Sequence, residues 1–321
     1  MTRGHAAASE MPRTSHLLNV DGREVSVSNL DKPMFPTGFT KGQAIDYYIR
    51  ISGHLLPHLI GRPITLKRYP NGITGKHFYE KDAPDYTPRW VHRFPVPRRS
   101  GESDICYILI DDLPALVWSV NLANLEMHPF LHRVPALQTP TAIVFDLDPG
   151  EGATILQCGE VAFLLKKRLD AARLRSFVKV SGSKGLQVYT PLNRAATYDV
   201  TQPFARGLAQ ILEREHRDLA VSEMAKELRK GKVFIDWSQN SDFKTTVAPY
   251  SLRAKQDQPY VSLPVRWKEL ADALKSGQAS RLYFTPEEAL ARIRGKKDIF
   301  APLLSLKQAI PDAARASRGS N

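Results

Sequence analysis

Apolar residues recur three or four positions apart in several segments of the chain, which is the period of an amphipathic helix. The clearest such segment runs from Ile45 to Leu59 and follows Thr40 and Gln43. The Thr-x-x-Gln spacing is a capping box, so we predict a helix that begins after Thr40. Thr285-Pro286-Glu287-Glu288 has the cap, the early proline and the early acids of another helix start. The same period predicts three further helices, over residues 159–174, 202–215 and 218–229.

Short runs of apolar and β-branched residues, bounded by turn residues, predict strands. They cover residues 141–148, 177–180, 186–190 and 233–237. The first run stops at Pro149-Gly150, and the second and third are joined by Ser181-Gly182-Ser183-Lys184-Gly185. Because the strands do not alternate strictly with helices, we expect an α+β fold and not a doubly wound parallel sheet.

The two ends of the chain differ in composition from its middle. Residues 1–15 and 306–321 are small and polar, so we expect flexible tails there and a single folded domain over residues 16–305. No apolar run approaches the roughly 20 residues that cross a bilayer, and no apolar leader opens the sequence. Two cysteines, Cys106 and Cys158, cannot form a disulfide framework. These observations favour a cytoplasmic protein without a membrane partner.

The charge balance indicates a polyanionic partner. The 321 residues include 45 Lys and Arg against 33 Asp and Glu, which gives a net charge of +12. A soluble protein of this size has no structural need for that excess, and it would attract DNA, RNA or an anionic membrane surface. A solvated basic surface without any partner explains the charge alone equally well.

Two aspartates alternate with apolar residues at the end of the first predicted strand. Because side chains alternate along a strand, Asp146 and Asp148 share one face while Phe145 and Leu147 point to the other. Two like charges held so close are most easily explained by a cation between them, and oxygen ligands favour Mg²⁺ or Mn²⁺. The alternative is a pair of exposed aspartates at a strand end, and a lone Asp-x-Asp favours it.

A third acid changes this balance. Asp236 interrupts the apolar strand 233–237, where aspartate is uncommon, and a buried aspartate needs a partner or a metal. Three carboxylates on strand surfaces are what a two-metal phosphoryl-transfer site requires, because the ions activate the attacking hydroxyl and stabilise the leaving oxygen. The alternative is that Asp236 caps the turn Ser238-Gln239-Asn240.

Several basic segments can bind phosphate. The loop 181–185 combines backbone N–H groups with Lys184, although an ordinary β-turn explains it as well. Lys41 falls in the first turn of a predicted helix, where the helix dipole favours a terminal phosphate, and Lys32 is near it in sequence. The alternative is an exposed pair of lysines. Three more cations surround the strand of Asp236 and can clamp a triphosphate: Arg229, Lys244 and Arg253.

Basic and aromatic residues interleave in residues 67–70 and 77–81. Aromatic rings such as Phe78 and Tyr79 can stack on exposed bases while neighbouring cations hold the phosphate backbone. Burial of both rings in the core is the alternative. His128 follows a mostly apolar run, and a lone histidine in that setting is more often structural than a ligand.

Taken in order, these segments resemble the polymerase domain of bacterial DNA ligase D, within the archaeo-eukaryotic primase superfamily. Three stretches look like its catalytic motifs: Asp146-Leu147-Asp148-Pro149-Gly150, Ser181-Gly182-Ser183-Lys184-Gly185-Leu186 and Asp236-Trp237-Ser238-Gln239-Asn240. Supporting matches lie at 31–32, 40–42, 62–63, 67–72, 125–128 and 244–253. The resemblance covers about Leu17 to Leu304. It implies a primase-like catalytic core with mixed and antiparallel sheets and an RRM-like palm flanked by helices.

The resemblance also implies an activity: a template-dependent nucleotidyltransferase that fills short DNA gaps carrying a 5′-phosphate. It implies NTP or dNTP substrates, a preference for ribonucleotides, and two Mn²⁺ or Mg²⁺ ions bound by Asp146, Asp148 and Asp236. Residues carried over by motif to the incoming nucleotide are His128, Ser181, Lys184, Gln187, Arg229, Gln239, Lys244 and Arg253. Lys32 and Lys41 would hold the downstream 5′-phosphate, and Arg68, Phe78 and Tyr79 would contact the template.

The sequence departs from the family at Gln187, where relatives commonly have histidine. Glutamine can donate a hydrogen bond but cannot carry a charge near neutral pH. No ligase or nuclease segment is recognised, so we expect sealing by a separate ATP-dependent ligase, with Ku as a further partner, in end joining or excision repair at the bacterial nucleoid. Two other functions stay open: a metal-dependent nuclease, and a non-catalytic DNA-binding module on the same fold.

Overall fold

The computed structural model describes residues 15–98, 100–101 and 103–311. Residues 1–14 and 312–321, most of the two predicted tails, therefore lie outside the described residues. Ser15 already begins a strand, and near the other end the Gln308 side chain donates to the backbone carbonyls of Arg175 and Pro191 while Ile310 is buried. Among the described residues, no helix is long and apolar enough to cross a membrane.

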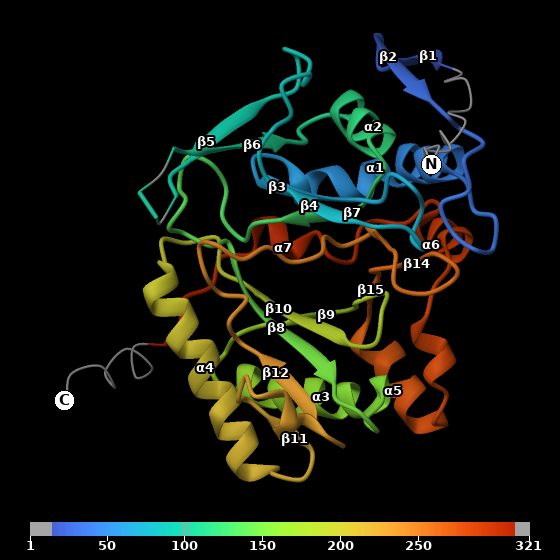
Figure 1. Ribbon diagram of the computed structural model, residues 1–321. Helices are drawn as coiled ribbons and strands as arrows, with labels where there is room; N and C mark the ends of the chain where they lie inside the picture. Colours follow the sequence, from blue (N-terminus) through green and yellow to red (C-terminus); the bar gives the residue numbers. More distant parts are fainter. Residues whose placement is uncertain (1–14, 99, 102, 312–321) are drawn as a thin grey trace, which may run out of the picture.

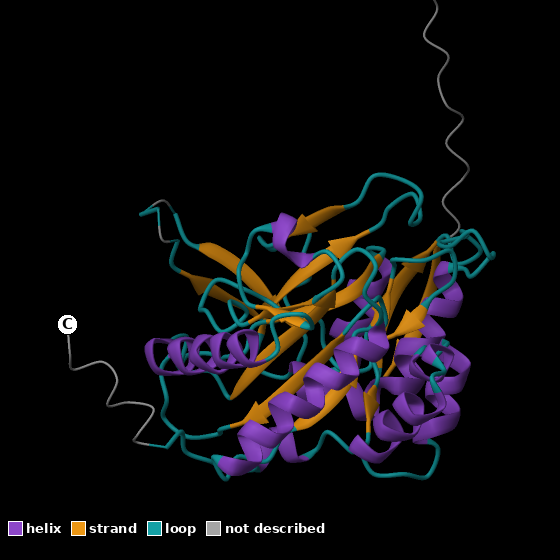
Figure 2. Ribbon diagram, turned by 90° about the horizontal axis from the view of Figure 1, so that it is seen from below, coloured by secondary structure: helices purple, strands orange, loops and turns teal. Residues whose placement is uncertain are grey.

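A six-stranded sheet forms the lower half of the molecule in Figure 1. Its strands, in spatial order, are β11 (Ala220–Val221), β12 (Val233–Asp236), β8 (Ala142–Pro149), β10 (Leu186–Pro191), β9 (Phe177–Val180) and β15 (Pro264–Val265). Neighbours run antiparallel except for the parallel pair of β11 and β12. Viewed from below, helices lie across the near face of the strands (Figure 2). Helices α3 (Ile155–Ala171) and α4 (Tyr198–Glu215) contact β8, and α5 (Trp267–Ser276) packs on α3.

A five-stranded sheet forms the upper half (Figure 1). Its strands are β4 (Phe78–Glu80), β3 (Pro63–Arg68), β6 (Ile105–Leu109), β5 (Arg93–Val96) and β7 (Asn124–Pro129), and β7 pairs with β3. The helices α1 (Lys41–Leu59) and α2 (Leu113–Asn121) belong to this half. Smaller elements complete the chain: β1 (Ser15–Val20), β2 (Arg23–Ser28), β13 (Leu252–Arg253), β14 (Tyr260–Val261), α6 (Pro286–Ile293), α7 (Pro302–Ser305) and 3₁₀ turns at Lys226–Arg229 and Ala279–Leu282.

One hydrophobic core joins the two sheets. It includes Ile64 and Met127 of the upper sheet and Phe145, Leu147 and Val188 of the lower sheet, all of them buried. Because apolar side chains of β8 and β10 face this core, the polar residues that alternate with them point to the opposite face. The alternation predicted for residues 141–148 is therefore present in β8, and it places the acidic side chains of this strand together.

Most predicted elements are confirmed. Thr40 caps α1 with the expected capping box, and Thr285 caps α6 in the same way. The helix predicted over 218–229 is wrong. Ala220 and Val221 instead pair with β12 as an edge strand, and a short 3₁₀ turn follows. An α-helix there would have to bury its apolar face, but the apolar side chains of Met224 and Leu228 are 43% and 50% exposed.

Candidate active site

A row of polar residues crosses the six-stranded sheet. In the strand register, Asp236 of β12 lies opposite Asp146 of β8, Asp146 opposite Gln187 of β10, and Gln187 opposite Lys179 of β9. Residues directly opposite on neighbouring strands present their side chains on the same face. Asp148, two positions after Asp146, joins this face. The three predicted carboxylates are therefore brought together by pairing between strands that are far apart in sequence, and we call them the acidic row.

Repulsion within the acidic row is only partly offset by the charges and hydrogen bonds around it. Burial, the charge of Asp148 and the charge of Asp236 raise the pKa of Asp146 to about 7, although hydrogen bonding from Gln187 and the charge of Lys179 oppose the rise. Desolvation and the charge of Asp236 likewise raise the pKa of Asp148, even though that side chain is exposed at the strand end. Like charges held this way repel unless a cation or a proton lies between them.

The donor set fits Mg²⁺ or Mn²⁺, since all three groups are carboxylates. Among the described residues, however, no group of three or more His, Cys, Asp or Glu side chains is placed so that it could hold a metal ion. Asp236 explains part of this, because its Oδ1 accepts from the backbone N–H of Ser238 at 2.9 Å and its Oδ2 accepts from Gln239 Nε2 at 3.0 Å. Asp236 thus caps its turn, as the alternative foresaw, and also faces Asp146. The two interpretations are compatible.

Lys244 and Gln239 lie next to Asp236. The Lys244 ammonium donates to the Ser238 hydroxyl, which in turn donates to Asp236. The 240–248 segment is fastened to the sheet by Asn240, which accepts from the backbone N–H of Val144 and donates to its carbonyl. The structure therefore places Gln239 and Lys244 at the same end of the acidic row.

Arg229, at the end of a 3₁₀ turn, and Arg253, on β13, flank the row, and both lower the pKa of Asp148. Gly150 allows the first approach, because a Cβ there would lie 1.8 Å from the Arg229 carbonyl oxygen. Gly182 allows the second: its φ is +68°, and a Cβ would lie 2.8 Å from Arg253 Cγ. Both glycines belong to the motifs found in the sequence. Because they lack a Cβ, they leave room for the segments that carry Arg229 and Arg253.

The 181–185 loop is held by its first residue. The Ser181 hydroxyl is buried and accepts from the backbone N–H groups of Ser183 and Gly185, each at 3.2 Å. Lys184 is exposed at the tip of the loop. Gln187 follows on β10 and is buried, donating to Thr246 Oγ1 at 3.0 Å and accepting from the Tyr189 hydroxyl at 3.2 Å.

The lysines predicted to bind a 5′-phosphate lie together on the upper half. The backbone N–H of Lys41 donates to the carbonyl of Lys32, and burial together with the charge of Lys32 lowers the pKa of Lys41 to about 8. The Lys41 ammonium donates to the backbone and side-chain oxygens of Asn121, and Lys32 donates to Asn71. Two cations with polar but uncharged partners keep their attraction for an anion.

The predicted template-binding aromatics lie on the surface and not in the core. Phe78 and Tyr79 are 40% and 56% exposed on β4. Arg68 is fully engaged: its Nη1 lies 2.8 Å from Glu80 Oε2, and its guanidinium lies over the ring of Phe78 at 5.3 Å. Tyr79 packs edge-on to His128, with ring centroids 6.2 Å apart. Arg68 therefore holds Phe78 in place more than it presents a free charge.

Two charged residues near the site were missed by sequence reasoning. Lys179 of β9 is fully buried opposite Gln187 and donates to the Ser262 hydroxyl. Its Nζ lies 5.8 Å from the centroid of the Tyr189 ring. Glu126 is fully buried next to His128 and Arg253. A charge inside an otherwise apolar strand is a signal that could have found both, because such charges are buried only when paired.

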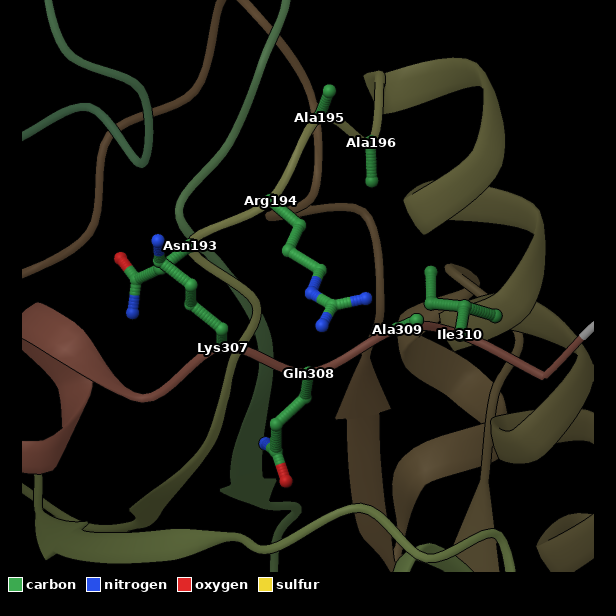
Figure 3. Close-up of a pocket in the computed structure, with 8 residues that line it drawn as sticks. All are labelled: Asn193, Arg194, Ala195, Ala196, Lys307, Gln308, Ala309 and Ile310. Carbon is green, nitrogen blue, oxygen red and sulfur yellow. The ribbon is translucent and has the colours of Figure 1, made fainter.

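A separate pocket of about 670 Å³ lies between residues 193–196 and 307–310 (Figure 3). None of the residues that line it is one of the predicted site residues. In the close-up, Arg194 extends from its loop toward the 308–310 segment. Volume alone would have drawn attention to this pocket, but the charge and register described above place the chemistry on the six-stranded sheet.

The fold and site define a class: an α+β nucleotidyltransferase with carboxylates on a central sheet and a basic, aromatic surface beside them. The sequence profile of the family described as "LigD, primase-polymerase domain" matches residues 40–300. The chain belongs to this family, which is one of nucleotidyltransferases, and its fold is the archaeo-eukaryotic primase fold that the sequence predicted.

Individual relatives agree with this assignment. The chain is 40% identical to the multifunctional non-homologous end joining protein LigD of Mycolicibacterium smegmatis over 87% of its length, and 32% identical to the bifunctional LigD of Bacillus subtilis over 84%. It spans 36% and 43% of those proteins. A solved structure, the polymerase domain of Mycobacterium tuberculosis Ligase D in complex with DNA, matches with a TM-score of 0.81 and 38% identity, covering 88% of this chain and 99% of that one.

Proposed function

We propose that this protein extends a DNA primer across a short gap under the direction of the template, adding nucleotides in DNA end joining and preferring ribonucleotides. The acidic row carries the proposal, because three carboxylates from two paired strands repel one another unless cations lie between them. The family membership and the similarity to a polymerase domain solved with DNA support it.

Asp146, Asp148 and Asp236 would hold two divalent ions, Mn²⁺ or Mg²⁺. Such ions, when bound, lower the pKa of a primer 3′-hydroxyl and neutralise charge on the transferred phosphate. Around this row, Arg253, Arg229 and Lys244 supply positive charge for the triphosphate, and the loop that begins at Ser181 adds backbone N–H groups and Lys184. Gln239 and Gln187 orient the acids by hydrogen bonds.

The DNA would lie along the basic and aromatic surface of the upper half. Phe78 and Tyr79 are exposed and can stack on template bases, while Lys32 and Lys41 bind the downstream 5′-phosphate. Most of the affinity would come from phosphate contacts, so it should fall steeply with salt. With a pocket for a downstream 5′-phosphate, the DNA substrate would be a gapped or broken duplex. A separate ATP-dependent ligase, with Ku, would act on the filled product at the bacterial nucleoid.

The decisive experiment is extension of a labelled primer across a gap of one to three nucleotides. NTPs and dNTPs are compared with Mn²⁺ and Mg²⁺, with and without the downstream 5′-phosphate. Templated addition stimulated by the 5′-phosphate is the expected result. Loss of that stimulation in Lys41→Met, with unstimulated addition unchanged, would place the phosphate at Lys32 and Lys41.

Three outcomes would each contradict the proposal or a part of it. Shortening of the labelled strand in Mn²⁺ without nucleotides would indicate a nuclease. Absence of addition under every condition, with gapped DNA still bound, would indicate a non-catalytic DNA-binding module. Binding that does not change with salt would contradict the electrostatic account of the DNA contacts.

A further inference from the structure

A single carboxylate lies at the centre of the charged residues beside the acidic row. Glu126 is on β7 between Leu125 and Met127, and its side chain is 0% exposed. Leu125 and Met127 are part of the hydrophobic core, so Glu126 points to the other face of the strand together with His128, two positions on. The carboxylate is therefore directed toward the same side as a residue expected at the nucleotide.

Glu126 has more donors than a carboxylate usually satisfies. Its Oε1 accepts from Lys67 Nζ at 3.0 Å, from the Tyr69 hydroxyl at 2.8 Å and from the backbone N–H of Ala254 at 3.2 Å. Its Oε2 lies 3.0 Å from His128 Nε2 and 3.2 Å from Arg253 Nε, the latter as an ion pair without aligned hydrogen-bond geometry. Burial opposes ionisation, but Arg253, His128 and Lys67 hold the pKa of Glu126 well below its usual range.

The two oxygens serve different parts of the protein. Oε1 bonds to Lys67 of β3, to Tyr69 just after this strand and to a backbone N–H, whereas Oε2 meets His128 and Arg253, the two side chains expected at the nucleotide. Arg253 connects this cluster to the acidic row, since it also lowers the pKa of Asp148.

We propose that Glu126 is a positioning residue for the incoming nucleotide: its Oε2 fixes the His128 imidazole and the Arg253 guanidinium so that their remaining donors face the triphosphate. The inference rests on the proposed function, because it assumes that a nucleotide binds there. It assigns Glu126 a role in nucleotide affinity and not in the chemical step. Because Nε2 of His128 donates to Glu126, the carboxylate also selects the ring tautomer.

The test compares Glu126→Gln with Tyr69→Phe. The first change keeps the shape and removes the charge from Oε2. The second removes one donor from Oε1 and leaves His128 and Arg253 in place. In primer extension, Glu126→Gln should raise KM for the NTP about tenfold, equivalent to about 1.4 kcal/mol, with kcat little changed. Tyr69→Phe should leave KM within about twofold. Equal effects of the two variants, or a fall in kcat alone, would overturn the proposal.

Loss of stability is controlled separately. Glu126→Gln leaves the Lys67 ammonium buried without a counter-charge, so the variant is also made with Lys67→Met, which removes both charges. The same rise in KM is expected in this double variant. An unchanged KM in the folded double variant would show that Glu126 serves stability alone.

A readout independent of activity separates this inference from the proposed function. The groups that face His128 are Glu126 on its own strand, Lys67 from β3, Tyr79 from β4 and Arg253 from β13. Burial lowers the pKa of His128, and Glu126 opposes that shift. NMR titration of His128 should therefore give a lower pKa in Glu126→Gln than in the parent. An inactive parent would refute the proposed function, whereas an unchanged His128 titration would refute the positioning by Glu126.

Discussion

The acidic row and the Glu126 cluster lie close together and treat carboxylates in opposite ways. In the row, burial and neighbouring carboxylates raise the pKa of Asp146 to about 7. At Glu126, two cations, a histidine and two further donors hold the pKa far below its usual range. Burial alone therefore does not reveal a functional acid. What matters is whether the partners are already present in the protein, as at Glu126, or must be supplied from outside, as in the row.

The largest expected effect on primer extension comes from removing a carboxylate of the acidic row. Asp148→Ala should reduce primer extension by on the order of 10³-fold or more, because a carboxylate that holds the ions is lost. Binding of gapped DNA should be retained or slightly strengthened, since a negative charge is removed. Primer extension and a mobility-shift assay on the same preparation test this. Retained extension would disprove the assignment of the row.

Matched amide substitutions should change stability in opposite directions. Glu126→Gln should lower the free energy of unfolding by about 3 kcal/mol, because it leaves buried cations unpaired. Asp146→Asn should raise it, because it removes repulsion from Asp148 and Asp236. Urea unfolding in the presence of a chelator at pH 8 measures both. Changes of the same sign would show that the two regions do not differ as described.

The free energy of unfolding should depend on pH through Asp146. The raised pKa of Asp146, from 3.8 to about 7, means that the folded protein holds this proton more tightly than the unfolded chain. Stability from this group is therefore lost as pH rises from about 4 to about 7, by on the order of 2–3 kcal/mol between pH 5 and pH 8. Urea unfolding of the metal-free protein at pH 5 and pH 8 should show this loss, and Asp146→Asn, in which only Asp148 keeps a raised pKa, should show a smaller one. Asp46→Asn, on an exposed helix surface, is the control that should behave as the parent.

A smaller effect is expected at the surface beside Glu126. Tyr79→Ala should weaken binding of gapped DNA about tenfold, because one stacking platform for a template base is lost. Tyr79→Phe keeps the ring and should bind as the parent does. Fluorescence anisotropy with a labelled gapped duplex measures both affinities. If the alanine and phenylalanine variants bind equally, Tyr79 does not stack on DNA.

The smallest expected effect concerns Gln187, which bonds Thr246 and lies between Asp146 and Lys179 in the row. Gln187→His should raise kcat a few-fold near pH 6 and less near pH 8.5, because only a protonated imidazole adds positive charge beside Asp146. Single-turnover extension at the two pH values measures this difference. A pH-independent gain would mean that shape, and not charge, distinguishes the two residues.

The sequence by itself was enough for much of the fold and for the acids of the site. Capping boxes at Thr40 and Thr285 and the alternation of residues 142–149 depend on neighbours a few positions away, so they can be recognised without tertiary information. The three motifs were also sufficient to indicate the family. The apolar residues of segment 218–229 have the period of a helix, which is why the prediction there is wrong. The strand with which Ala220 and Val221 pair, β12, comes later in the chain.

Only the tertiary structure decided which of these residues meet. Asp236 faces Asp146 because β12 pairs with β8 in one register, and a shift by one residue would turn that side chain to the opposite face. Glu126 and Lys179 gained their roles in the same way, from cations and acids that strand pairing and loop packing bring beside them. Local propensity depends on adjacent residues, but the charge state of a buried group depends on everything packed around it, and that is determined by the completed fold.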